Sequence, residues 1–266
     1  MSILRHSCRV EIELLTSAVA ALVGFLVGLT GVGAGALMTP ILILGFGVAA
    51  PVAIATDLVY ATITKLVGGV THMRAGVIQW RLLKRLWIGG VAGAVMGAGI
   101  VIAVVELEMD TSWLKYPLGV IIGLASISLF LRLRRKQKPV NPSTEVSSNS
   151  WVAPAGGVGI GLAVSMTSVG AGALGMALLT RLSPRGTTPQ SLVGTDLLLA
   201  VPIALTAGLG YLVTGLVDFS LLLSLLAGSI PGVVLGSAVS RKISGPLLTA
   251  VVATALLAAA VLVLLD

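Results

Sequence analysis

Thr30-Gly31-Val32-Gly33-Ala34-Gly35 and Thr167-Ser168-Val169-Gly170-Ala171-Gly172 are two copies of one short motif, one in each half of the chain. Glycine lets the backbone leave helical geometry and approach a ligand closely, because no side chain stands in the way. Each copy comes immediately before or at the start of a short apolar stretch. The pair therefore predicts two helices that are broken at related positions.

The match between the two halves continues beyond this motif. Thr56-Asp57-Leu58 recurs as Thr195-Asp196-Leu197, and a series of Gly and Leu residues follows at one constant spacing. Shared Gly and Leu alone arise easily in apolar sequence, but an ordered series that includes Thr-Asp does not. Because many transporters are two copies of one unit, we interpret the chain as a duplication.

The composition assigns the chain to the membrane proteins. Hydrophobic residues make up 56% of its 266 residues, charged residues 10%, and the mean hydropathy is +1.07. The net charge of +7 comes from basic residues in short loops between apolar runs, which is typical of topology signals and contact with membrane lipid and argues against a nucleic-acid partner. With one cysteine and two histidines, we predict no disulfide, no metal and no cofactor.

The apolar runs predict an all-α integral membrane fold. A helix needs about 20 apolar residues to cross a bilayer core of about 30 Å, and on that basis we expect ten segments. The second and seventh are short and resemble half-helices, since a segment of about twelve residues reaches only about 18 Å. The expected segments are 12–29, 35–46, 52–66, 86–105, 116–131, 152–166, 172–182, 192–208, 216–239 and 246–265.

Charge divides and orients the two copies. Loops rich in Lys and Arg stay on the cytoplasmic side, and such clusters occur from Lys65 to Arg85, at 132–138, and at two later pairs, whereas the loop at 106–110 is acidic. These signals agree only if each Gly-rich pair of segments begins and ends on the same side, as two crossings or as a re-entrant hairpin. The repeats are then inverted, and both chain ends lie outside the cell (inner) membrane, which the chain crosses several times. The expected parts are a first transmembrane repeat at 12–131, a cytoplasmic linker at 132–151 and a second transmembrane repeat at 152–266.

The two Gly-rich motifs are the strongest candidates for a substrate site. Unwound backbone inside a membrane must be covered by protein or line a wet cavity. The first free N–H groups of the following helix, at its positive dipole end, suit an anion. The alternative is that the small residues only allow close helix packing. The candidate substrate-binding residues are Thr30, Gly31, Gly33, Gly35, Thr167, Ser168, Gly170 and Gly172.

Asp57 and Asp196 stand at equivalent positions of the two copies. An ionisable group inside a membrane segment by default marks a functional site such as a proton relay. Equally, Thr-Asp near the start of an apolar run can cap a helix at the bilayer surface. We take both aspartates as candidates for coupling or gating. His72 and Arg74 are further candidates for a gate or an anion funnel, although their predicted cytoplasmic loop favours plain solvation.

Two glycine series point to packing and not to chemistry. Gly89, Gly93 and Gly97, like Gly228, Gly232 and Gly236, recur at intervals of four and so line one face of a helix.

The chain contains no His-Glu-x-x-His, no nucleotide-binding Gly-x-x-x-x-Gly-Lys-[Ser/Thr] loop and no Gly-x-Ser-x-Gly elbow. We therefore predict that the protein is not an enzyme.

Over nearly its whole length the chain resembles the TauE/SafE sulfite exporter family, also called the toluene sulfonate uptake permease family. The resemblance lies in the two Gly-rich motifs, in Pro40 after the first, and in the run from His72 to Trp80 with its glycine ladder. It implies transport of sulfite, sulfur-containing organic anions or other small anions through inverted repeats. The chain departs from the family pattern at Ala34, Ala171, Ser168 and Ala177, which leaves the particular substrate in doubt.

Three functions remain open at this stage. The leading hypothesis is a secondary transporter, an exporter of sulfite or an organosulfonate, that binds the anion between the two Gly-rich breaks and works by alternating access. A passive anion channel would share the breaks. A membrane scaffold subunit without a substrate would use the glycines for packing alone. The oligomeric state, including a homodimer, is not determined by the sequence.

Overall fold

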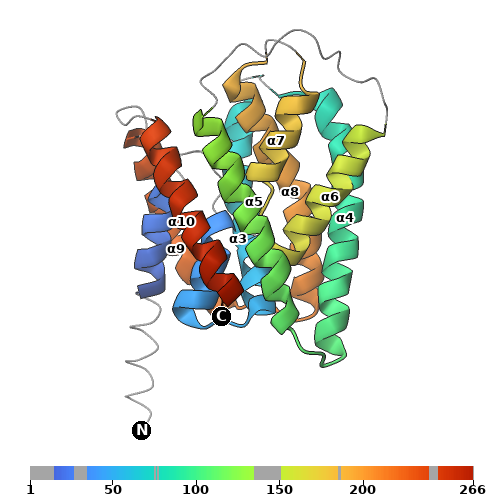
Figure 1. Ribbon diagram of the computed structural model, residues 1–266, viewed down its shortest axis with the longest axis vertical. Coiled ribbons are helices and arrows are strands. Elements are labelled where there is room, and N and C mark those ends of the chain that lie inside the picture. The colour runs from blue at the N-terminus through green and yellow to red at the C-terminus, as the bar shows by residue number, and fades with distance from the viewer. Residues whose placement is uncertain are drawn as a thin grey trace.

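The computed structural model describes residues 15–26, 35–74, 76, 78–134, 151–184, 187–239 and 245–265. In these ranges the protein is a helical bundle without β-strands (Figure 1). The linker expected at 132–151 lies outside the described residues from position 135 to position 150. The helices are Leu15–Leu26, α2 Gly35–Pro40, the π-helix η1 Ile41–Gly45, α3 Ala50–Arg74, α4 Trp80–Glu106, the 3₁₀ turn η2 Ser112–Leu114, α5 Lys115–Arg134, α6 Val152–Thr167, α7 Ala173–Leu182, α8 Pro189–Val213, α9 Phe219–Val239 and α10 Gly245–Leu265.

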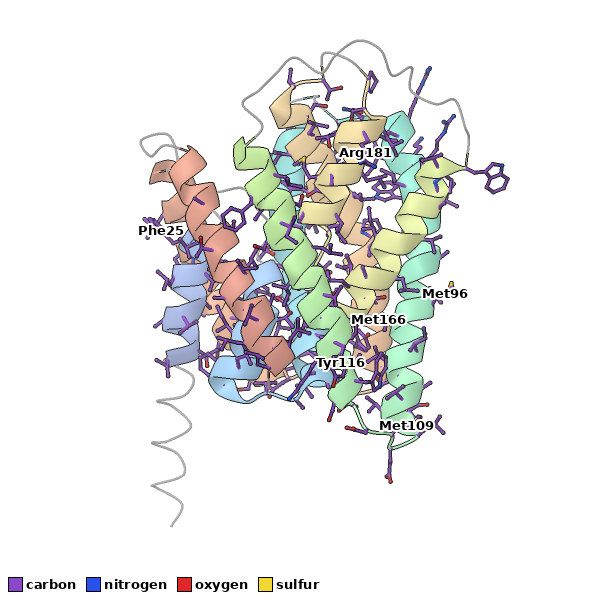
Figure 2. All side chains as sticks on the ribbon, viewed as in Figure 1. Phe25, Met96, Met109, Tyr116, Met166 and Arg181 are labelled. Carbon is purple, nitrogen blue, oxygen red and sulfur yellow. The ribbon has the colours of Figure 1, made fainter. Side chains whose placement is uncertain are left out.

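Several of these helices have the length and apolar surface of membrane spans. Four are long and apolar enough to cross a bilayer: Trp80–Glu106, Ser112–Leu131, Ser191–Val213 and Phe219–Gly236. Ile88 and Met96 on α4 are 72% and 55% exposed, and Figure 2 shows Met96 pointing away from the bundle. Extended apolar surface of this kind is costly in water, whereas lipid accommodates it.

The glycine ladder of α4 packs against α6. A Cβ atom at Gly93 would collide with the Val158 carbonyl oxygen of α6, and one at Gly161 of α6 would collide with the Gly90 carbonyl oxygen of α4. The two backbones therefore touch directly, which only glycine permits. This confirms the packing role predicted for the ladder.

The same arrangement joins α9 to the helix Leu15–Leu26. A Cβ atom at Gly232 of α9 would collide with the Ala21 carbonyl oxygen, and one at Gly228 would collide with the Ser17 carbonyl oxygen. Two further large helix pairs are α3 with α8 and α5 with α10. Each of these four pairs combines one helix from before the linker with one from after it.

Helix α3 is longer than the sequence predicted. It continues from the expected end at residue 66 to Arg74, so His72 and Arg74 belong to a helix and not to the expected loop. Lys65, which we assigned to a cytoplasmic cluster, is buried with 6% of its surface exposed. The prediction was wrong because Lys65 and the following glycines suggested a boundary, whereas Gly69 allows α3 to pack closely against Leu198 of α8. Tertiary packing overrides the weak helix propensity of glycine here.

Candidate functional site

The second Gly-rich motif forms the break between α6 and α7. Helix α6 ends at Thr167, and the backbone then takes positive φ angles at Ser168 (57°) and Gly170 (112°) before α7 begins at Ala173. In Figure 1, α6 descends from the upper end of the bundle and α7 returns to that same end. The turn between the two helices therefore lies inside the molecule.

Hydrogen bonds within the break use the Thr167 side chain. Its hydroxyl donates to the Ala163 carbonyl oxygen (2.6 Å) and accepts from the Val169 N–H (3.2 Å). Gly172 stands at the N-cap of α7. Thr167 thus stabilises the turn itself, while the rest of the motif shapes the backbone.

Asp57 of α3 meets this break from the other half of the chain. It is fully buried, its Oδ2 accepts a hydrogen bond from the Thr39 hydroxyl (2.6 Å), and the Ser168 side chain faces its carboxylate. Asp57 Oδ1 and Ser168 Oγ are buried without a hydrogen-bond partner among the described residues. Buried polar atoms nearly always have partners in folded proteins, so this pair marks a place for a ligand or a water molecule.

The aspartates are not helix caps. Asp57 and Asp196 lie well inside α3 and α8 and are 0% and 8% exposed, which excludes the capping alternative for these side chains. The neighbouring threonines do accept hydrogen bonds from backbone N–H groups just before a helix, but these are the starts of other helices. Thr56 accepts the N–H of Asp218 before α9 (3.1 Å), and Thr195 accepts the N–H of Gln79, the N-cap of α4 (3.2 Å).

Asp196 has different surroundings. Its carboxylate packs against Gly175 of α7, at a distance that leaves no room for a Cβ atom. Lys65 interacts electrostatically with both Asp196 and Asp57. Lys65 is not among the site residues predicted from the sequence, although a lysine about two helical turns from a membrane-embedded aspartate is a signal that could have identified it.

The other predicted site residues lie away from this cluster or outside the described residues. Outside the described residues are Thr30, Gly31 and Gly33. Helix α2 begins at Gly35. The backbone of His72 is in the last turns of α3. Arg74, at the end of this helix, is exposed and lies about 25 Å along the helix axis from Asp57, at a rise of about 1.5 Å per residue. Within the described ranges, no three His, Cys, Asp or Glu side chains come together as a metal site.

Comparison with known proteins places the chain in one family. A family model described as sulfite exporter TauE/SafE matches residues 16–263. The chain belongs to the sulfite exporter TauE/SafE family. Family membership and the apolar helices make it a multi-pass membrane transporter, and the family implies a small anion as its substrate.

Relatives of this TauE/SafE protein carry transporter names. It is 37% identical over 227 residues to "Probable membrane transporter protein YjnA" of Bacillus subtilis (strain 168), a match that covers 84% of this chain and 88% of the relative. It is 28% identical over 225 residues to "Probable membrane transporter protein YdhB" of the same organism, covering 81% and 85% of the two chains. These names indicate a transporter and not an enzyme. No solved structure matches the chain.

Proposed function

We propose that this TauE/SafE protein is a secondary transporter that exports a small anion, sulfite or an organosulfonate, by alternating access. The observation that carries the proposal is a pair of buried polar atoms, Ser168 Oγ and Asp57 Oδ1, that have no hydrogen-bond partner within the described ranges and lie beside a helix break inside the molecule. A break of this kind is where transporters bind their substrates. The anion would lie between this break and the first copy of the Gly-rich motif, of which residues 30–34 are outside the described residues.

An inverted-repeat architecture is part of the proposal, and matched contacts support it. The contact of Gly93 with Val158 has its counterpart in the contact of Gly232 with Ala21. In the same way, Thr56 accepts the N–H of Asp218, as Thr195 accepts that of Gln79. In both cases the two halves of the chain exchange roles, as a two-fold axis requires. The equivalent helices α3 and α8 run antiparallel (Figure 1), which supports an axis in the membrane plane.

The distribution of charge supports an orientation. Figure 2 shows Arg181 at one end of the bundle and Met109, within the acidic loop, at the other. Helices α3 and α5 end with Arg74 and Arg134, and α5 ends at the upper end of the bundle in Figure 1, where Figure 2 labels Arg181. With this basic end in the cytoplasm, both chain termini lie outside the cell membrane.

The chemistry of the break suits an oxyanion. The backbone at residues 168–172 is not helical, and the positive dipole end of α7, which begins directly after it, favours negative charge. The Leu174 and Gly175 N–H groups of its first turn already donate to the Gly170 carbonyl oxygen. The Ser168 hydroxyl, which faces the Asp57 carboxylate, adds a donor without a hydrogen-bond partner in the described part of the chain. Asp57 and Asp196 are the proposed coupling groups, since buried carboxylates in membrane helices commonly carry protons.

Flux measurements in proteoliposomes test this function. Protein reconstituted with sulfite should show saturable flux, and a screen over sulfate, sulfonates and small carboxylates should rank sulfite or a sulfonate first. Gly33→Leu and Gly170→Leu should abolish this flux, whereas Gly159→Leu, on α6 with open space beside it, should preserve it. If the Gly33 and Gly170 variants insert normally and move sulfite at the parental rate, the proposed site is wrong. Flux that does not saturate would indicate a channel, and the absence of flux for every anion would indicate a scaffold.

A further inference from the structure

The two repeat-related aspartates have unequal neighbours. Asp57 accepts a hydrogen bond from Thr39, whereas the position that matches Thr39 in the second copy is Met176, which cannot donate one. Lys65 is likewise present in one copy only, because the matching position is Ala204. One buried cation therefore serves a pair of buried carboxylates.

The position of Lys65 along α3 places it nearer to Asp196. It lies eight residues beyond Asp57, which is about 12 Å along the helix axis. Helix α8 runs antiparallel to α3 beside it (Figure 1), and Gly69 of α3 lies against Leu198 of α8. Asp196 is therefore level with a position beyond Lys65 on α3, about 9 Å from Lys65 along the axis. Lys65 therefore lies between the two aspartates along the helix axis and interacts electrostatically with both, with the shorter axial separation to Asp196.

We infer that Lys65 gives the two aspartates different roles. Asp196 is the ionised counter-ion of Lys65, whereas Asp57 carries a proton and, with Ser168, binds the anion. This inference rests on the proposed transport function. The ligand class is a small oxyanion that moves together with one proton.

Electrostatics requires the proton at Asp57. An oxyanion beside the Ser168 hydroxyl would face the Asp57 carboxylate, and two like charges in a buried site repel strongly. A protonated carboxyl group is instead a hydrogen-bond donor. Because Oδ2 already accepts from Thr39, Oδ1 is the atom that would carry the proton and donate to a substrate oxygen.

The proposed coupling step involves only the transfer of one proton to and from Asp57. Asp57 takes a proton from water on one side of the membrane, which forms one O–H bond and neutralises the carboxylate, and it releases that proton to water on the other side with the anion. Lys65 and Tyr60 of α3 are the titratable groups that interact electrostatically with Asp57, and Asp196 from α8 faces Lys65. Pairing Lys65 with Asp196 leaves no second cation near Asp57 among the described residues.

A stability measurement tests the charge assignment independently of transport. In detergent, Lys65→Met and Asp196→Asn should each lower the melting temperature by about 5 °C or more, because each leaves a buried charge without its partner. The double variant Lys65→Met/Asp196→Asn should recover most of that loss, and Lys65→Met/Asp57→Asn should not. Lys84→Met, which removes an exposed charge from α4, is the matched control and should leave the melting temperature unchanged. Recovery by the Asp57 double variant in place of the Asp196 one would overturn the assignment.

Proton movement tests the second half of the inference. Proteoliposomes loaded with a pH-sensitive dye should show about one proton per sulfite in the parental protein. Asp57→Asn should lose this proton movement and the response of sulfite flux to a pH gradient, whereas Asp196→Asn, where it folds, should keep the ratio at a lower rate. Retained proton movement in Asp57→Asn contradicts the inference even if sulfite is transported. If the parental protein moves no sulfite at all, the proposed function fails, and the stability measurement still decides which aspartate pairs with Lys65.

Discussion

Two glycine-rich regions of α6 use the same residue for opposite purposes. Along the helix, Gly157 and Gly161 keep regular geometry and let α4 approach until the backbones touch. After the helix ends, Gly170 has a φ of 112°, and its neighbour Ser168 has a φ of 57°. In the first region glycine removes a side chain, and in the second it makes an unusual backbone conformation available. Tight packing along the helix supports the break at its end.

The largest effect should come from adding a methyl group within the packed region. In Gly93→Ala the new Cβ meets the Val158 carbonyl oxygen and the Leu162 N–H, and these backbone atoms cannot move aside as a flexible side chain can. We expect the free energy of unfolding to fall by about 3 kcal/mol, measured by thermal unfolding in detergent. Equal stability of Gly93→Ala and Gly99→Ala, on the open side of the same helix, would show that α4 and α6 are not in backbone contact.

A smaller loss of stability but a clear loss of function is expected at the break. Gly170→Ala forces a side chain into a positive φ and brings its Cβ to 3.1 Å from Leu174 Cδ1, which should cost about 1–2 kcal/mol. Sulfite flux in proteoliposomes should fall several-fold, because the backbone around Ser168 shifts. The comparison of the two regions fails if stability and flux are both unaffected.

Ser168→Ala should separate function from folding. The hydroxyl is buried without a partner among the described residues, so removing it should change the free energy of unfolding by less than about 1 kcal/mol, in either direction. Flux should nevertheless fall, since the substrate loses a donor. Ser165→Ala is the matched control on α6: its hydroxyl donates to the Leu162 carbonyl oxygen, so its loss should affect stability slightly and flux not at all. The reverse pattern would assign Ser168 a purely structural role.

The smallest effect should come from glycines with open surroundings. Gly99→Ala on α4 and Gly159→Ala on α6 meet no atom within 4 Å of the added Cβ. Because alanine is the better helix former, stability should be unchanged or rise by up to about 1 kcal/mol, and flux should stay at the parental rate. A marked loss in either variant would mean that another molecule covers that face.

Much of the fold could be predicted from sequence because the membrane limits what a chain can do. Apolar runs of about 20 residues predict the spanning helices, and a four-residue spacing of glycines predicts the packed face on α4. The end of α3 could not be predicted this way. Lys65 and the glycines after it look like a loop in the sequence, but Lys65 is buried in the structure and Gly69 packs against Leu198 of α8.

The candidate site, too, was predicted only in part from the sequence. The sequence by itself selected Ser168, Gly170, Asp57 and Asp196, because glycine beside hydroxyl groups and carboxylates within apolar runs have few other uses in a membrane. Only the tertiary structure brought Ser168 to Asp57, engaged the Thr167 hydroxyl within the turn and buried Lys65. These pairings join residues from opposite halves of the chain or depend on the path of the backbone between helices. Hydrophobic periodicity records which residues avoid water, but it carries no information on which distant residues meet.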